Sequence, residues 1–169
     1  MRKTLDALYG VAGWVAAVFM VGLLLMVLLT IVSRLLHFYV PGTDAYAGYL
    51  MAGSGFLALA HTLKKGEHIR VSLLVNQLQG RSRFWLEVWA LLLAIVLSGL
   101  LAYYSLRLAW QSHVFNDIST GNDATALWIP QIPMVLGALL MCVACIDELV
   151  LRWRGKGNAF VQAEAASHE

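Results

Sequence analysis

The chain has 169 residues, of which 60% are hydrophobic and 13% are charged, and its formal net charge is +2. So apolar a composition would leave far too much apolar surface in water, which excludes an ordinary soluble domain. The small positive charge does not indicate nucleic-acid binding, because the basic residues lie between or beside apolar runs and no RNA-binding motif is present.

Four stretches of the chain contain no Asp, Glu, Lys or Arg: residues 7–32, 45–63, 88–106 and 124–146. About 20 helical residues cross the roughly 30 Å hydrocarbon core of a bilayer. We therefore predict an all-α integral membrane protein with four transmembrane helices, at approximately 7–33, 44–63, 85–110 and 129–152. We expect residues 1–153 to form one four-helix membrane domain and residues 154–169 to form a flexible cytoplasmic tail.

The first apolar stretch also distinguishes a membrane helix from a secretory signal peptide. It runs to 26 residues, whereas the apolar region of a signal peptide has about 7–15. We therefore expect this helix to be retained.

The basic residues indicate the orientation of the four helices. Ten of the twelve precede the first helix, separate the second from the third, or follow the fourth. Because cytoplasmic segments carry the excess of Lys and Arg, we expect both termini to be cytoplasmic. Only Arg34 and Arg107 fall on the outer side, where each could pair with an acidic side chain or extend to the lipid headgroups.

The second and third helices each carry small residues at spacings of three or four, which places them on one helix face. Such faces let helices approach closely in lipid. We interpret them as candidate contacts with a neighbouring helix or subunit, against the alternative that Ala and Gly are simply common in membrane helices. The residues are Gly48, Ala52 and Gly55 in the second helix, and Ala90, Ala94, Ser98 and Ala102 in the third.

The segment between these two helices, residues 66–80, is too polar to cross a membrane. Its apolar residues recur at i, i+3, i+4 and i+7, which is typical of an amphipathic helix. We predict a short helix lying in the cytoplasmic interface, with an apolar face formed by Val71, Leu74, Val75 and Leu78. Further along the chain, Pro130 and Pro133 are expected to mark the beginning of the fourth helix.

No catalytic, cofactor-binding or metal-binding residues are predicted. Cys142 and Cys145 form a Cys-x-x-Cys pair, but it falls within an apolar helix, where we expect both to serve packing. The histidine pair His37 and His113 near the outer side leaves one alternative, a redox membrane anchor that binds haem or quinone.

Several segments together resemble the small, DctQ-like membrane subunit of tripartite ATP-independent periplasmic (TRAP) transporters. The similarity covers about residues 5–153 and includes Ile31 to Arg34 after the first helix. It is strongest over residues 57–71, and it returns at Ala126 to Pro133 before the fourth helix. The residues that match the family pattern are Arg34, Gly66, His68, Ile69, Val71, Pro130 and Pro133. One departure is Thr43-Asp44 at the start of the second helix, where the family commonly has Trp and Glu.

The resemblance implies a non-catalytic permease subunit without cofactors, located in a bacterial inner membrane. Its expected partners are a large multi-helix membrane subunit, a periplasmic substrate-binding protein and membrane lipid. Such a subunit is expected to scaffold the large one during sodium-driven uptake, by symport, of an organic anion, commonly a carboxylate.

Overall fold

The computed structural model describes residues 2–64 and 81–153. They form α1 (Arg2–Leu35), α2 (Thr43–Lys64), α4 (Arg81–Val114) and α5 (Trp128–Trp153). These described ranges contain no strand, and Ile118 and Ala126 form one isolated bridge in the loop between α4 and α5. Two predicted segments lie outside the described residues: the interfacial segment at 66–80 and the tail at 154–169. The first of these contains Gly66, His68 and Ile69 and the predicted apolar face from Val71 to Leu78.

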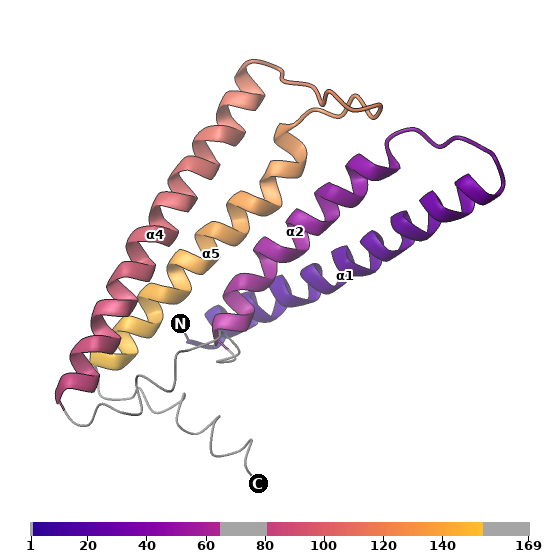
Figure 1. The fold of residues 1–169 in the computed structure, drawn as a ribbon. Helices are drawn as coiled ribbons and strands as arrows, with labels where there is room; N and C mark the ends of the chain where they lie inside the picture. The colour runs from indigo at the N-terminus through magenta and orange to yellow at the C-terminus, as the bar shows by residue number, and fades with distance from the viewer. Residues whose placement is uncertain (1, 65–80, 154–169) are drawn as a thin grey trace, which may run out of the picture.

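The four helices run alternately up and down and lie side by side in the order α1, α2, α5, α4 (Figure 1). Neighbours in this order pack on one another, and α1 and α4 form the two edges. The beginnings of α1 and α4 and the ends of α2 and α5 lie at one end of the molecule, hereafter the inner end (Figure 1). The loops joining α1 to α2 and α4 to α5 lie at the opposite, outer end.

Three of the four helices are long and apolar enough to cross a membrane: Leu5–Leu35, Phe84–Val114 and Trp128–Trp153. This finding confirms an all-helical membrane chain. In α2, glycine, serine, tyrosine and histidine replace many of the long aliphatic side chains, which lowers its mean hydropathy. The prediction that α2 also crosses therefore stays a prediction.

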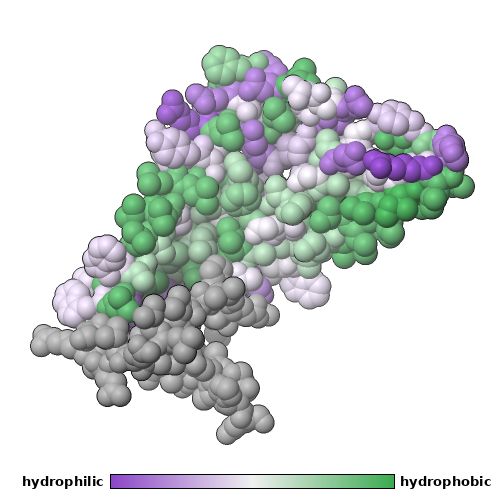
Figure 2. Space-filling model, in the orientation of Figure 1, coloured by the Kyte–Doolittle hydropathy of each residue, from purple (hydrophilic) through white to green (hydrophobic). Residues whose placement is uncertain are grey.

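The apolar surface of the molecule faces outward rather than into a core. In α1, the most apolar window is only 6% buried. Figure 2 shows strongly hydrophobic residues over α4 and α1, residues of intermediate hydropathy between them, and hydrophilic residues at the outer end. This distribution is what a lipid environment requires.

The C-termini of α1 and α4 end in the same way, with a residue in the left-handed conformation. His37 has a φ of 55° and Asn116 a φ of 52°. After α1, the N–H of Phe38 donates to the carbonyl of Ser33 and that of His37 to the carbonyl of Arg34. This is the Schellman pattern, which satisfies carbonyls that the helix end leaves free. Asn116 and Asp117 repeat it after α4.

Candidate functional site

The small-residue stripe of α4 lies mainly against α5, its packing neighbour. Ser98 and Ala102 are buried and Ala94 is half-buried, whereas Ala90, nearest the inner end, is exposed. The buried side continues through Ser105 and on to Ser112, whose hydroxyl accepts a hydrogen bond of 3.1 Å from Gln131 of α5. This stripe is thus largely used within the chain.

The small residues of α2 lie differently. Gly48, Ala52 and Gly55 are all exposed, and a Cβ added at Gly48 or Gly55 would meet no atom within 4 Å. We call these three residues the α2 small face. None of the other described helices, α1, α4 and α5, covers this face.

Other glycines lie where two helices approach closely. A Cβ at Gly137 of α5 would lie 2.3 Å from the backbone oxygen of Phe56 in α2, and one at Gly53 would lie 2.5 Å from the ring of Phe19 in α1. Gly13 of α1 similarly faces the ring of His61, since a Cβ added at Gly13 would lie 2.9 Å from the nearest ring atoms. Nothing in the spacing of Gly13, Gly53 and Gly137 sets them apart from the other glycines in the sequence, so their packing roles could not be predicted from it.

At the inner end, an ion pair joins α4 to α5. Arg152 pairs with Glu87, and each side chain is only 15% exposed. Glu148, one turn before Arg152, is also buried, at 6% exposure. Glu87 and Arg152 lie far apart in the sequence, so their pairing follows only from the fold.

At the outer end, the loop between α4 and α5 is tied to α2 through Asp123. Its carboxylate accepts hydrogen bonds from Tyr49 at 3.1 Å and from Ser119 at 2.8 Å. Partial desolvation opposes ionisation of Asp123, but hydrogen bonds from Thr125, Ser119 and Tyr49 outweigh it and hold the pKa of Asp123 below its ordinary value. Gly42 fits beside this residue, since a Cβ there would lie 2.8 Å from the Cβ of Asp123.

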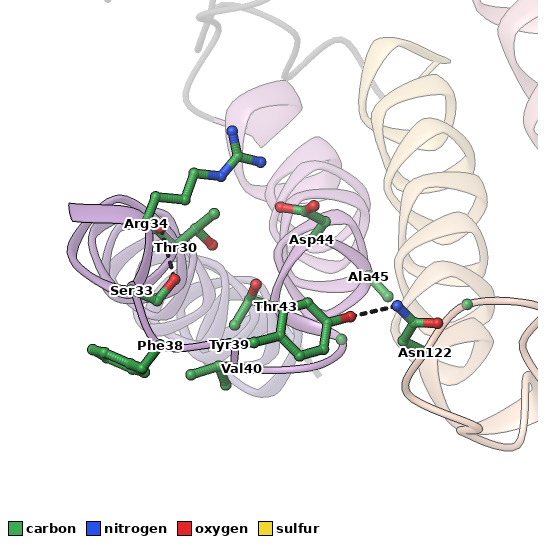
Figure 3. A pocket seen from close by; sticks show the side chains of 12 residues that line it. Thr30, Ser33, Arg34, Phe38, Tyr39, Val40, Thr43, Asp44, Ala45 and Asn122 are labelled. Atoms are coloured by element: carbon green, nitrogen blue, oxygen red, sulfur yellow. Dashed lines mark hydrogen bonds between the residues drawn. The ribbon is translucent and has the colours of Figure 1, made fainter. Parts of the chain in front are cut away.

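A pocket of about 230 Å³ opens at the outer end between the end of α1 and the start of α2 (Figure 3). Arg34 and Asp44 line it from α1 and α2 respectively, together with Thr30, Ser33 and Thr43. Asn122 donates a hydrogen bond of 2.5 Å to the hydroxyl of Tyr39 and closes one side. No ion pair joins Arg34 to Asp44, although both line the same pocket.

The histidines proposed for the redox alternative do not come together. His37 caps the end of α1 in the left-handed conformation, and the ring of His113 packs edge-on against Trp128 at 5.3 Å. His37 follows the end of α1 and His113 is in the last turn of α4, and these helices form the two edges of the layer (Figure 1). Within residues 2–64 and 81–153, no group of three or more His, Cys, Asp or Glu could hold a metal ion. The redox alternative is therefore unsupported.

A comparison with protein families finds a match that covers most of the chain. A family model described as "Tripartite ATP-independent periplasmic transporters, DctQ component" matches residues 23–155. The match confirms the resemblance noted in the sequence, and it concerns a transporter component rather than an enzyme. No curated protein matches the chain.

Proposed function

This chain belongs to the DctQ component family of tripartite ATP-independent periplasmic transporters, and we propose that it is the static scaffold of such a transporter. In this proposal it supports a large membrane subunit in a bacterial inner membrane. The large subunit transports an organic anion, commonly a carboxylate, which a periplasmic binding protein delivers. A sodium gradient drives this transport.

The distribution of ionisable side chains favours a scaffold role over a transport role for this chain. The charged residues of α1, α4 and α5 lie near helix ends, as with Asp6, Glu87 and Glu148, and the middle of each helix is uncharged. Carriers that couple an ion to a substrate usually place ionisable groups or broken helices at mid-membrane depth. The described helices are also uninterrupted.

We propose that α2 crosses the membrane as the fourth span. It packs against both α1 and α5, which are long and apolar enough to cross. Its 22 residues correspond to about 33 Å of helix at 1.5 Å per residue. Because ten of the twelve basic residues precede the charge-free run of α1, fall between those of α2 and α4, or follow that of α5, we propose that both termini are cytoplasmic.

The observation that carries the scaffold proposal is the uncovered α2 small face. Small residues let a second helix approach the backbone closely, and lipid tails cannot exploit that shape as well as a helix can. The corresponding stripe on α4 is mostly used against α5, so of these two stripes the one on α2 is available to a partner. We propose that a helix of the large subunit packs on Gly48, Ala52 and Gly55.

Co-purification of the two subunits tests this assignment. A tagged chain with Gly55→Leu should recover at least tenfold less of the large subunit than the unmodified chain, because the leucine fills the space that the partner helix occupies. The matched control is Gly10→Leu on α1, where an added Cβ also meets no atom within 4 Å. This control should leave recovery unchanged. Equal recovery with Gly55→Leu and the unmodified chain would contradict the assignment.

A further inference from the structure

The outer pocket brings together two opposite charges that have no partner among residues 2–64 and 81–153. Neither Arg34 nor Asp44 has a side-chain hydrogen bond or ion pair with any residue that the structure describes. Figure 3 shows them on facing elements, Arg34 on α1 and Asp44 at the start of α2. A ligand that carries one negative and one positive group would complement both.

Hydroxyl groups provide further polar contacts in this pocket. Thr43 is 8% exposed and Ser33 is 7% exposed, and both line the cavity. The hydroxyl of Ser33 donates to the carbonyl of Thr30 at 2.9 Å, which leaves its oxygen able to accept. Thr43 makes no side-chain hydrogen bond within the described part of the chain, so its hydroxyl is available to an oxyanion.

The surroundings of the pocket suit a lipid. It lies where the apolar run of α1 ends, beside Leu35 and Leu36, which are 72% and 67% exposed. An acyl chain can therefore continue along the apolar surface of α1 while its headgroup occupies the pocket. The volume of about 230 Å³ is below the roughly 300–1,000 Å³ that holds a whole drug-sized ligand, and it fits a headgroup.

We propose that this pocket binds the phosphoethanolamine headgroup of a phospholipid in the outer leaflet, with Arg34 facing the phosphate and Asp44 facing the ammonium. Guanidinium groups bind phosphate oxygens through two parallel hydrogen bonds, and a carboxylate accepts from an ammonium. The proposal rests on the membrane orientation given under the proposed function. It does not depend on the docking of the large subunit.

Native mass spectrometry of the full chain in detergent tests the proposal. Delipidated protein is mixed with equal concentrations of phosphatidylethanolamine and phosphatidylglycerol, which share the phosphate but differ in the ammonium. Because hydrogen bonds between charged groups are among the stronger ones, we expect about tenfold preference for phosphatidylethanolamine. Arg34→Gln should lower the binding of both lipids about tenfold, whereas Asp44→Asn should abolish only the preference. Arg34→Lys should restore part of the binding.

Matched controls use Arg107→Gln and Asp117→Asn, which change exposed residues of the outer end that do not line the pocket. They should bind both lipids as the unmodified chain does. Lipid binding that is equal for the two headgroups and insensitive to both pocket variants would overturn the proposal, provided that circular dichroism shows unchanged helix content. A competition with soluble phosphoethanolamine separates a lipid from a free solute. Displacement of the lipid at equimolar concentration would assign the pocket to a solute and refute the lipid assignment.

The two proposals fail separately. Loss of lipid selectivity with intact recovery of the large subunit would remove only the lipid site. Loss of recovery with intact selectivity would remove only the docking face.

Discussion

The replacement Gly137→Ala should weaken the packing between α5 and α2. The added Cβ would lie 2.3 Å from the backbone oxygen of Phe56 and 2.4 Å from its carbonyl carbon. Ordinary contacts begin near 3.4 Å, so the two helices must separate by about 3.4 − 2.3 = 1.1 Å at this point. The obstacle is backbone, which cannot rotate away as a side chain can.

Such overpacking typically costs about 1–3 kcal/mol. The better helix propensity of alanine offsets about 0.5–1 kcal/mol of this. We therefore expect the free energy of unfolding to fall by up to about 2.5 kcal/mol, and by about 1–3 kcal/mol relative to a glycine-to-alanine replacement that meets no obstacle. The measurement is unfolding of the chain in detergent micelles by titration with a denaturing detergent, followed by far-ultraviolet circular dichroism.

Gly99→Ala is the matched control, because its Cβ would lie 4.0 Å from the sulfur of Cys142, an ordinary contact distance. It should be neutral or stabilise the chain by up to about 1 kcal/mol. If Gly137→Ala were as stable as Gly99→Ala, the close approach of α5 to α2 at Phe56 would be refuted.

Three further replacements test other parts of the structure. His37→Gly should stabilise the chain by about 0.5–1 kcal/mol, because His37 has a φ of 55° and glycine adopts that conformation without strain. His37→Val should destabilise the chain, because a β-branched residue is strained at that φ. A valine variant more stable than the unmodified chain would contradict the left-handed conformation at the end of α1. Because the pKa of Asp123 is lowered in the folded chain, its ionised form stabilises the fold above the unfolded pKa, near 4, and this contribution disappears as the pH falls through the lower folded pKa. The difference in thermal midpoint between the unmodified chain and Asp123→Asn should therefore shrink in acid, and a difference independent of pH would refute the role of the carboxylate. Glu87→Gln should destabilise the chain by about 2 kcal/mol by weakening the ion pair with Arg152. The double variant with Arg152→Gln should lose less than the sum of the two single losses, and strict additivity would exclude coupling between the residues.

Much of the fold follows from local sequence. Long uncharged runs require helices in lipid, because every backbone polar group must be satisfied within its own segment. The helix ends extend beyond those runs: α4 begins at Arg81 and continues to Val114, since charged and polar residues can continue a helix into the headgroup region. Local sequence does not show this extension.

The faces used for packing could not be predicted from spacing alone. Ala52 and Gly53 are adjacent and both small, yet Ala52 is exposed and Gly53 lies against the ring of Phe19. Adjacent residues point about 100° apart on a helix with 3.6 residues per turn, and small residues suit either direction. Only the positions of α1 and α5 decide which face is inward.

Contacts between distant segments also could not be predicted from the sequence. The bond between Tyr49 and Asp123 joins residues 74 positions apart. The sequence indicates only that Asp123 belongs to an outer loop. Similarly, Arg34 and Asp44 fall on either side of one loop, and the divergence of α1 and α2 at the outer end is what opens a pocket between them (Figures 1 and 3).

Uptake by proteoliposomes tests most directly whether the chain supports transport rather than performing it. Vesicles containing this chain alone, the large subunit with this chain, or neither are given a sodium gradient, the periplasmic binding protein and its organic-acid ligand. We predict uptake by the two-subunit vesicles and none above the empty vesicles for the chain alone. Sodium-dependent uptake by the chain alone would contradict the account.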